Sequence, residues 1–94
     1  MNSVQLKLYI TGDTPRSELA VANLKHLVKE KLTGLFECEM VIIDVLERAD
    51  CAEEDKVMAT PTLIKQFPAP ARRVIGDLSD HDKVLNALGL QYAI

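Results

Sequence analysis

The first half of the chain changes from a strand-like to a helix-like pattern of apolar residues. From Val4 to Ile10, apolar and polar residues alternate with period two, which is typical of a strand with one buried face. Thr14 can cap free backbone N–H groups, and Pro15 is tolerated at a first helical position, so the two predict a helix start. This helix is expected to end at Thr33-Gly34. Its apolar stripe consists of Val21, Leu24, Val28 and Leu32.

The next apolar segment, Phe36 to Leu46, predicts a second strand. It is rich in β-branched residues, and its continuous apolar run over 40–43 favours a central strand covered on both faces. A strand, a helix and a second strand in this order predict a right-handed βαβ unit with parallel strands.

Shorter elements follow in the second half. Asp50, with Glu53 three residues later, predicts a capped short helix that ends near Met58. Pro61 opens a candidate strand and must lie at a sheet edge or a strand start, because proline has no N–H for the ladder. Residues 72–75 predict a hairpin partner for that strand.

The C-terminal segment carries two patterns. Ser79, followed by Asp82, predicts the cap of a final helix. Beyond it, the apolar residues recur at strand period, so the end of the chain is compatible with helix and with strand. The helical stripe consists of Val84, Leu85 and Leu88, and the alternating set of Leu88, Leu90, Tyr92 and Ile94.

Composition indicates one ordinary globular domain over residues 1–94, since 48% of the residues are apolar and 27% are charged. The net charge of −3 argues against nucleic acid or an anionic membrane as a partner. The chain has neither an apolar run of membrane-spanning length nor a secretion signal at its start, so we expect a cytoplasmic protein.

Few residues suggest catalysis or metal binding. Cys38 and Cys51 do not form a C-x-x-C motif and are expected to be free thiols. His26 and His81 have no cysteine or histidine at metal-ligand spacing, and glycine-rich phosphate loops and serine-hydrolase motifs are absent. The sequence therefore predicts no catalytic residue, metal or cofactor.

The predicted order βαβαββα resembles the thioredoxin-like α/β fold. In that fold, the proline that opens the third strand commonly has a cis peptide bond, and Pro61 occupies this position. Redox members carry C-x-x-C in the loop after the first strand, where the helix N-terminus stabilises a thiolate. The corresponding loop here, residues 11–15, contains no cysteine.

A more specific resemblance, to the KaiB family, covers nearly the whole chain. It implies a non-enzymatic regulator that binds a KaiC-type ATPase in circadian timing or in a related stress or signalling system. It also implies a homodimer or homotetramer, and a C-terminal half able to switch to a different ground-state arrangement. The sensor domain of the kinase SasA is similar as well, which adds a histidine kinase as a further partner. The blocks that carry the resemblance are Leu6–Tyr9, Gly12–Pro15, Ile43–Leu46, Ala52–Lys56, Ala59–Leu63, Arg72–Ser79 and Lys83–Leu85.

The resemblance implies that Lys56, beside Glu53 and Glu54, contacts the partner. A charged face on a short helix is also commonly just solvated, so both interpretations stand. Arg72 and Arg73 could bind carboxylates of a partner through paired hydrogen bonds. Alternatively, they are edge-strand charges that discourage aggregation.

The alternative from the enzyme class is a divergent thiol oxidoreductase or glutathione-binding protein. The missing loop cysteine argues against it. Pro61 is interpreted as a structural determinant and not as a substrate contact.

Overall fold

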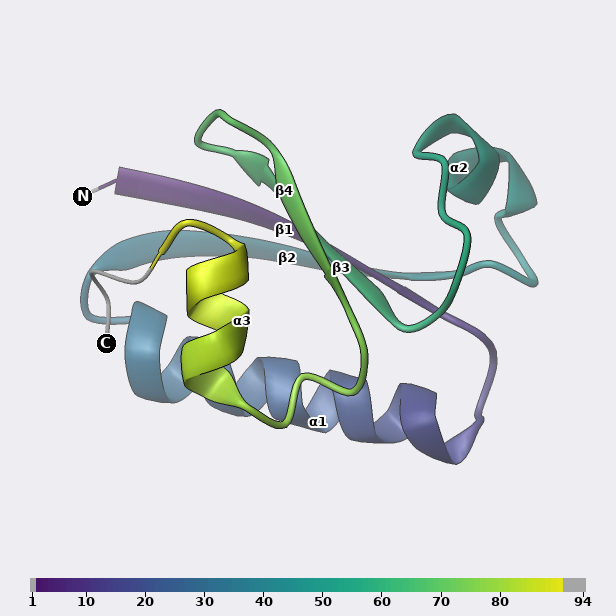
Figure 1. The fold of residues 1–94 in the computed structure, drawn as a ribbon, viewed down its shortest axis with the longest axis horizontal. Coiled ribbons are helices and arrows are strands. Elements are labelled where there is room, and N and C mark those ends of the chain that lie inside the picture. Colours follow the sequence, from purple (N-terminus) through teal and green to yellow (C-terminus); the bar gives the residue numbers. More distant parts are fainter. Residues whose placement is uncertain (1, 91–94) are drawn as a thin grey trace.

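The computed structural model describes residues 2–90 and has the predicted order βαβαββα (Figure 1). The thioredoxin-like arrangement expected from the sequence is thus confirmed. The elements are β1 (Asn2–Ile10), α1 (Pro15–Leu27), the π-helix η1 (Val28–Leu32), β2 (Phe36–Asp44), α2 (Ala49–Glu54), β3 (Thr62–Phe67), β4 (Arg72–Ile75) and α3 (His81–Ala87).

The four strands form one sheet in the order β2-β1-β3-β4. β1 pairs in parallel with β2 and antiparallel with β3, and β3 continues antiparallel into β4. Helices α1 and α3 cover one face of the sheet, whereas the short α2 lies on the opposite face (Figure 1). The two faces of β1 therefore meet different helices.

The core is built on the alternation in β1. Val4, Leu6 and Leu8 are at most 2% exposed and pack in one cluster with apolar residues of α1, η1, β3 and α3. Burying leucine and valine side chains in this way supplies the main driving force for folding. The helical partners in the cluster include Ala20, Leu24, Leu27, Leu32, Val84, Leu85 and Leu88.

The predicted start of α1 is confirmed. Thr14 accepts the backbone N–H of Ser17 on its hydroxyl oxygen, and Pro15 is the first helical residue. The helix widens at its end into the π-turn η1, where the N–H of Thr33 reaches the carbonyl of Val28 at 2.9 Å.

The predicted central position of β2 is wrong. β2 is an edge strand, and Met40, Val41 and Ile42 are 37%, 49% and 37% exposed. A continuous apolar run fits a strand inside a sheet whose two faces are both covered, whereas a strand at the end of a sheet is less shielded by its neighbours. Here β3 pairs with the other side of β1, so within residues 2–90 β1 is an inner strand and β2 is the last strand on its side of the sheet.

Two predicted caps are displaced. α2 begins after Arg48, without a side-chain cap, so Asp50 lies inside its first turn and the helix ends at Glu54, before Met58. In α3 the cap is Asp80, which accepts the N–H of Lys83 at 3.1 Å, in place of the predicted Ser79. The Ser79 N–H is already bonded to the carboxylate of Asp77, so Ser79 belongs to the turn before the helix, and α3 begins one residue later than predicted.

The C-terminal segment is described as far as Leu90. Leu88 and Leu90 are both fully buried, and the N–H of Leu90 bonds the carbonyl of Leu85 at 2.8 Å. The predicted alternation beyond this point, at Tyr92 and Ile94, lies outside the described residues. Over residues 2–90, no helix has the length and apolar character needed to cross a membrane.

We predict that Leu24→Ala lowers the free energy of unfolding by about 2–5 kcal/mol, because Leu24 is fully buried and its removal leaves a cavity. Leu19→Ala is the matched control on the same helix, since Leu19 is 46% exposed, and its effect should stay within about 1 kcal/mol. Urea unfolding followed by circular dichroism measures both. Equal losses would contradict the described orientation of α1.

Candidate protein-binding site

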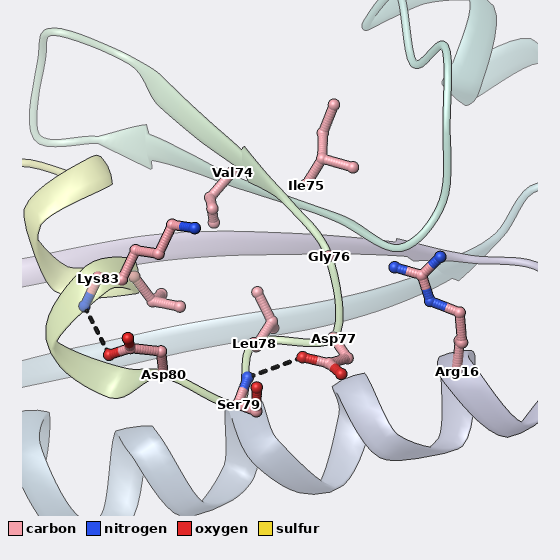
Figure 2. A pocket seen from close by; sticks show the side chains of 10 residues that line it. Arg16, Val74, Ile75, Gly76, Asp77, Leu78, Ser79, Asp80 and Lys83 are labelled. Atoms are coloured by element: carbon pink, nitrogen blue, oxygen red, sulfur yellow. Dashed lines mark hydrogen bonds between the residues drawn. The ribbon is translucent and has the colours of Figure 1, made fainter.

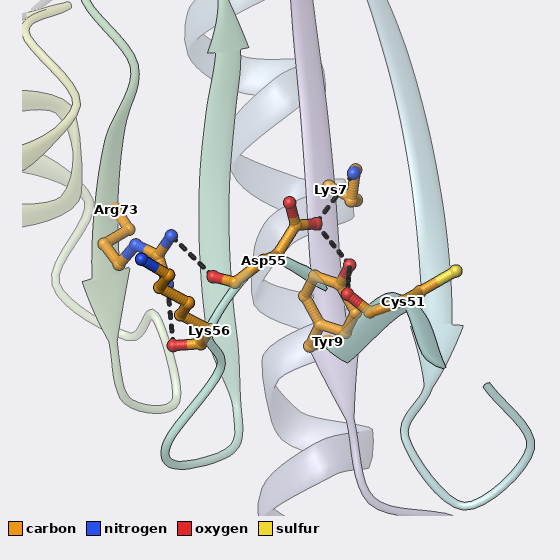
Figure 3. A network of polar contacts seen from close by, with 6 residues as sticks. All are labelled: Lys7, Tyr9, Cys51, Asp55, Lys56 and Arg73. Atoms are coloured by element: carbon orange, nitrogen blue, oxygen red, sulfur yellow. Dashed lines mark hydrogen bonds and ion pairs between the residues drawn. The ribbon is translucent and has the colours of Figure 1, made fainter. Parts of the chain in front are cut away.

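Helix α2 is attached to the sheet by a small polar network (Figure 3). Asp55, at the C-terminal end of α2, accepts a hydrogen bond from Lys7 Nζ at 2.8 Å and another from the Tyr9 hydroxyl. The same hydroxyl lies 3.1 Å from the carbonyl oxygen of Cys51. Lys7 and Tyr9 alternate with the core residues of β1, so they point to the face on which α2 lies.

The network shifts the pKa values of Asp55 and Tyr9 in opposite directions. Hydrogen bonds from Lys7 and then from Tyr9 hold the pKa of Asp55 below its usual range, because both stabilise the carboxylate. Burial first, and then the bond to Asp55, raise the pKa of Tyr9 far above its usual range. Asp55 is therefore ionised and Tyr9 is neutral at neutral pH.

Arg73 of β4 joins the network from the side (Figure 3). Its guanidinium donates to the backbone carbonyl of Asp55 at 2.9 Å and to that of Lys56 at 3.4 Å. These carbonyls follow the last turn of α2, where cationic side chains are favourable partners. Lys56 has a left-handed backbone with φ of 54°, so this end of α2 has a defined turn.

The outer surface of α2 combines charge with exposed apolar groups. Glu53, Glu54 and Lys56 are exposed there, as the sequence suggested for a contact surface. Beside them lies a hollow of about 520 Å³, and Met58 and the nearby Leu46 are 91% and 71% exposed. The hollow is lined by Val45, Ala49, Ala52, Glu53, Lys56, Val57 and Met58.

Arg72 is not part of this arrangement, although it is adjacent to Arg73 in sequence. Successive residues of a strand point to opposite faces. Arg72 accordingly lies on the α3 side, where its Nε would be 3.2 Å from a Cβ added at Gly89. The structure thus brings Lys56, Glu53, Glu54 and Arg73 together and separates them from Arg72.

The loop after β1 carries hydroxyl groups where a redox protein would carry thiols. Ser17 Oγ accepts the N–H of Thr11 at 3.0 Å and a hydrogen bond from the Thr14 hydroxyl at 2.8 Å. The hydroxyls of Thr11 and Thr60 also hydrogen-bond to each other. The Thr60-Pro61 peptide bond beside them is cis, and Pro61 is buried. Hydrogen bonds of hydroxyl groups therefore hold this loop in place, and it contains no thiol that could act as a low-pKa nucleophile.

The two cysteines are free and lie on opposite sides of the sheet. Cys38 of β2 packs against the core, and burial raises the pKa of its thiol, which lowers the fraction of reactive thiolate. Cys51 lies on α2. Within residues 2–90, no group of three histidine, cysteine or acidic side chains is arranged to hold a metal ion.

Sequence reasoning missed Lys7, Tyr9 and Asp55. The available signal was that β1 has polar residues on the face away from its core positions, which included a lysine and a tyrosine. The sequence alone gave no reason to place Asp55, 48 residues away from Lys7, against that face.

We predict that Asp55→Asn lowers the free energy of unfolding at pH 7 by about 1–3 kcal/mol, because Lys7 loses a charged partner that is shielded from solvent. The folded-state pKa of Asp55 lies below the unfolded value of about 3.9. Its contribution is therefore complete above about pH 4 and disappears as the pH falls through the folded-state pKa.

Denaturant unfolding between pH 2 and 7 measures this contribution, and the acid-induced loss of stability should be shallower in Asp55→Asn. Asp50→Asn is the control on the same helix, because the Arg48–Asp50 pair is largely exposed and contributes little. If the free energy of unfolding fell equally steeply toward low pH in the wild type and in Asp55→Asn, the proposed role of Lys7 and Tyr9 would be contradicted.

Known proteins resemble this chain in sequence and in fold. The KaiB domain model matches residues 7–90. The circadian clock protein KaiB3 of Synechocystis sp. is 50% identical over 90 residues, which span 96% of this chain and 86% of that protein. The circadian clock oscillator protein KaiB of Microcystis aeruginosa is 49% identical over 87 residues, spanning 93% and 82% of the two chains.

Among solved structures, the N-terminal domain of Synechococcus elongatus SasA has a TM-score of 0.76 at 22% identity, covering 100% of this chain and 90% of that one. Mitochondrial thioredoxin 3 of Saccharomyces cerevisiae has a TM-score of 0.72 at 18% identity, with 95% and 79% covered. At such identities the likeness concerns the fold alone, whereas the sequence matches are specific. This chain belongs to the KaiB family.

Proposed function

We propose that this protein is a non-enzymatic regulator that binds a KaiC-type ATPase through the outer surface of α2, in circadian timing or in a related stress or signalling system. The observation that carries the proposal is the exposed surface at the end of α2. It places the charges of Glu53 and Lys56 at an apolar hollow that Met58 also lines, and Glu54 is exposed on the same helix. Its relatives named as circadian clock proteins support the same role.

The chemistry of this surface suits a protein partner. An apolar side chain as exposed as that of Met58 gains stability when a partner covers it, and charges at the rim select the partner's orientation. Arg73 holds the C-terminal end of α2 against the sheet through its hydrogen bonds to the backbone carbonyls of Asp55 and Lys56. We therefore assign Arg73 a positioning role, and leave Lys56, Glu53 and Glu54 as direct contacts.

Several features remain part of the proposal. Arg72, on the other face, would serve a separate contact. A cytoplasmic location, a homodimer or homotetramer, and a second arrangement of the C-terminal half are proposed from the family resemblance. A histidine kinase is proposed as a further partner, in line with the fold shared with the SasA domain.

We expect a KaiC-type ATPase to co-purify with the tagged protein from its native host when ATP is present. Lys56→Glu combined with Met58→Ser should weaken binding to that ATPase at least about tenfold, because both a charge and an apolar contact are lost. Calorimetry with the purified ATPase measures the dissociation constant, and mass spectrometry identifies the partner.

The control for this experiment is Lys25→Glu combined with Leu19→Ser on α1, which makes the same kinds of change on the opposite side of the sheet. It should leave the affinity unchanged. Recovery of only a histidine kinase or redox proteins would contradict the ATPase proposal. Equal weakening by both double variants would contradict the α2 surface.

The alternative function, a thiol oxidoreductase or glutathione-binding protein, gives a different result in a simple assay. We expect no reduction of insulin by the protein in the presence of dithiothreitol beyond the rate without protein, since the loop after β1 contains no thiol. Turnover that disappears in Cys38→Ser or Cys51→Ser would overturn the non-enzymatic assignment.

A further inference from the structure

A second cavity lies on the side of the sheet opposite α2 (Figure 2). It has a volume of about 230 Å³ and is enclosed by the end of β4, the loop 76–80 and the first turns of α1 and α3. Val74 and Leu78 provide apolar lining, and Arg16 and Lys83 stand on opposite sides of the loop. None of these four residues belongs to the α2 surface.

The loop that forms the cavity is held in a defined shape. Leu78 has a left-handed backbone with φ of 65°, which is unfavourable for leucine, yet its side chain is only 3% exposed and anchors the loop in the core. Asn23 of α1 donates to the carbonyl of Asp77 at 2.7 Å. The cavity is therefore present before any ligand binds, and its walls need little rearrangement.

The acidic side chains at the cavity are already bonded to the backbone. Asp77 accepts the N–H of Ser79 at 3.1 Å, and hydrogen bonds from the Ser79 side chain first and from this N–H second hold the pKa of Asp77 below its usual range. Asp80 accepts the N–H of Lys83 in the same way. By contrast, the side chain of Lys83 makes no hydrogen bond or ion pair within residues 2–90, and that of Arg16 makes none directly, although its positive charge helps to lower the pKa of Asp77.

The positions of these two cations are locally unfavourable. Arg16 and Lys83 each lie in the first turn of a helix, where the backbone dipole disfavours positive charge. A cation at a locally unfavourable position that no carboxylate contacts directly is typical of a functional position. Both cations stand at the same cavity, and an anion bound there would stabilise them.

The neighbouring strand adds a second kind of contact. β4 is the last strand of the sheet and pairs only with β3 within the described residues, so its outer edge offers free backbone N–H and C=O groups. Ile75 of β4 is 59% exposed beside it. A small anion would use the cations alone, whereas an extended peptide would also use this edge.

The geometry points to a second protein-binding site, at which an extended acidic segment of a partner adds to the edge of β4 and places a carboxylate between Arg16 and Lys83. On the α3 side of this edge, three cationic side chains accompany two carboxylates that are already bonded to the backbone, which favours an acidic segment although the whole chain is negative. The cations are Arg16, Arg72 and Lys83, and the carboxylates are those of Asp77 and Asp80.

The test uses a blocked ten-residue peptide in which glutamate alternates with valine, and a second peptide with glutamine in place of glutamate. We expect the acidic peptide to cause saturable amide shifts in residues 72–83 in two-dimensional NMR of the ¹⁵N-labelled protein. Arg16→Gln combined with Lys83→Gln should raise the dissociation constant about tenfold. The glutamine peptide should bind more weakly to the wild type by a similar factor.

The matched control is Lys25→Gln combined with Lys29→Gln, which removes the same charge from exposed positions away from the cavity. It should change the dissociation constant less than twofold. Absence of saturable shifts, equal effects of the two double variants, or the same shifts with free glutamate would overturn the strand-addition site. The Lys56→Glu, Met58→Ser variant should bind the peptide normally, so failure here is distinguishable from failure at α2.

Discussion

The structure depends on the two different faces of β1. On one face, Val4, Leu6 and Leu8 are withdrawn from water by α1 and α3, and this contact fixes both helices to the sheet. On the other face, Lys7 and Tyr9 are held at the same spacing and meet α2. Because side chains alternate strictly along a strand, neither set can move without the other.

This constraint explains how a helix as short as α2 is held in a defined position. A helix of six residues buries no side chain of its own and cannot be stable by itself. Its position comes from Asp55, which bonds to β1, and from Arg73, which bonds to the backbone at the helix end. The exposed charges and the methionine beside them can then face a partner without having to support the fold.

The same sheet separates the two proposed surfaces. α2 and the cavity at loop 76–80 lie on opposite faces, and β4 contributes to both because its alternate residues point to opposite sides. Arg73 turns toward α2, whereas Val74 lines the cavity.

The sequence by itself determined the order βαβαββα, the core face of β1 and the start of α1, because these follow from short-range periodicity and capping. Only the tertiary structure decided that β2 lies at an edge, that Asp80 caps α3, and that Arg72 and Arg73 serve opposite faces. The pairing of Lys7 with Asp55 likewise depends on how distant segments meet. Local patterns specify which residues prefer burial or a turn, but strand order and long-range contacts depend on the packing of all the elements together.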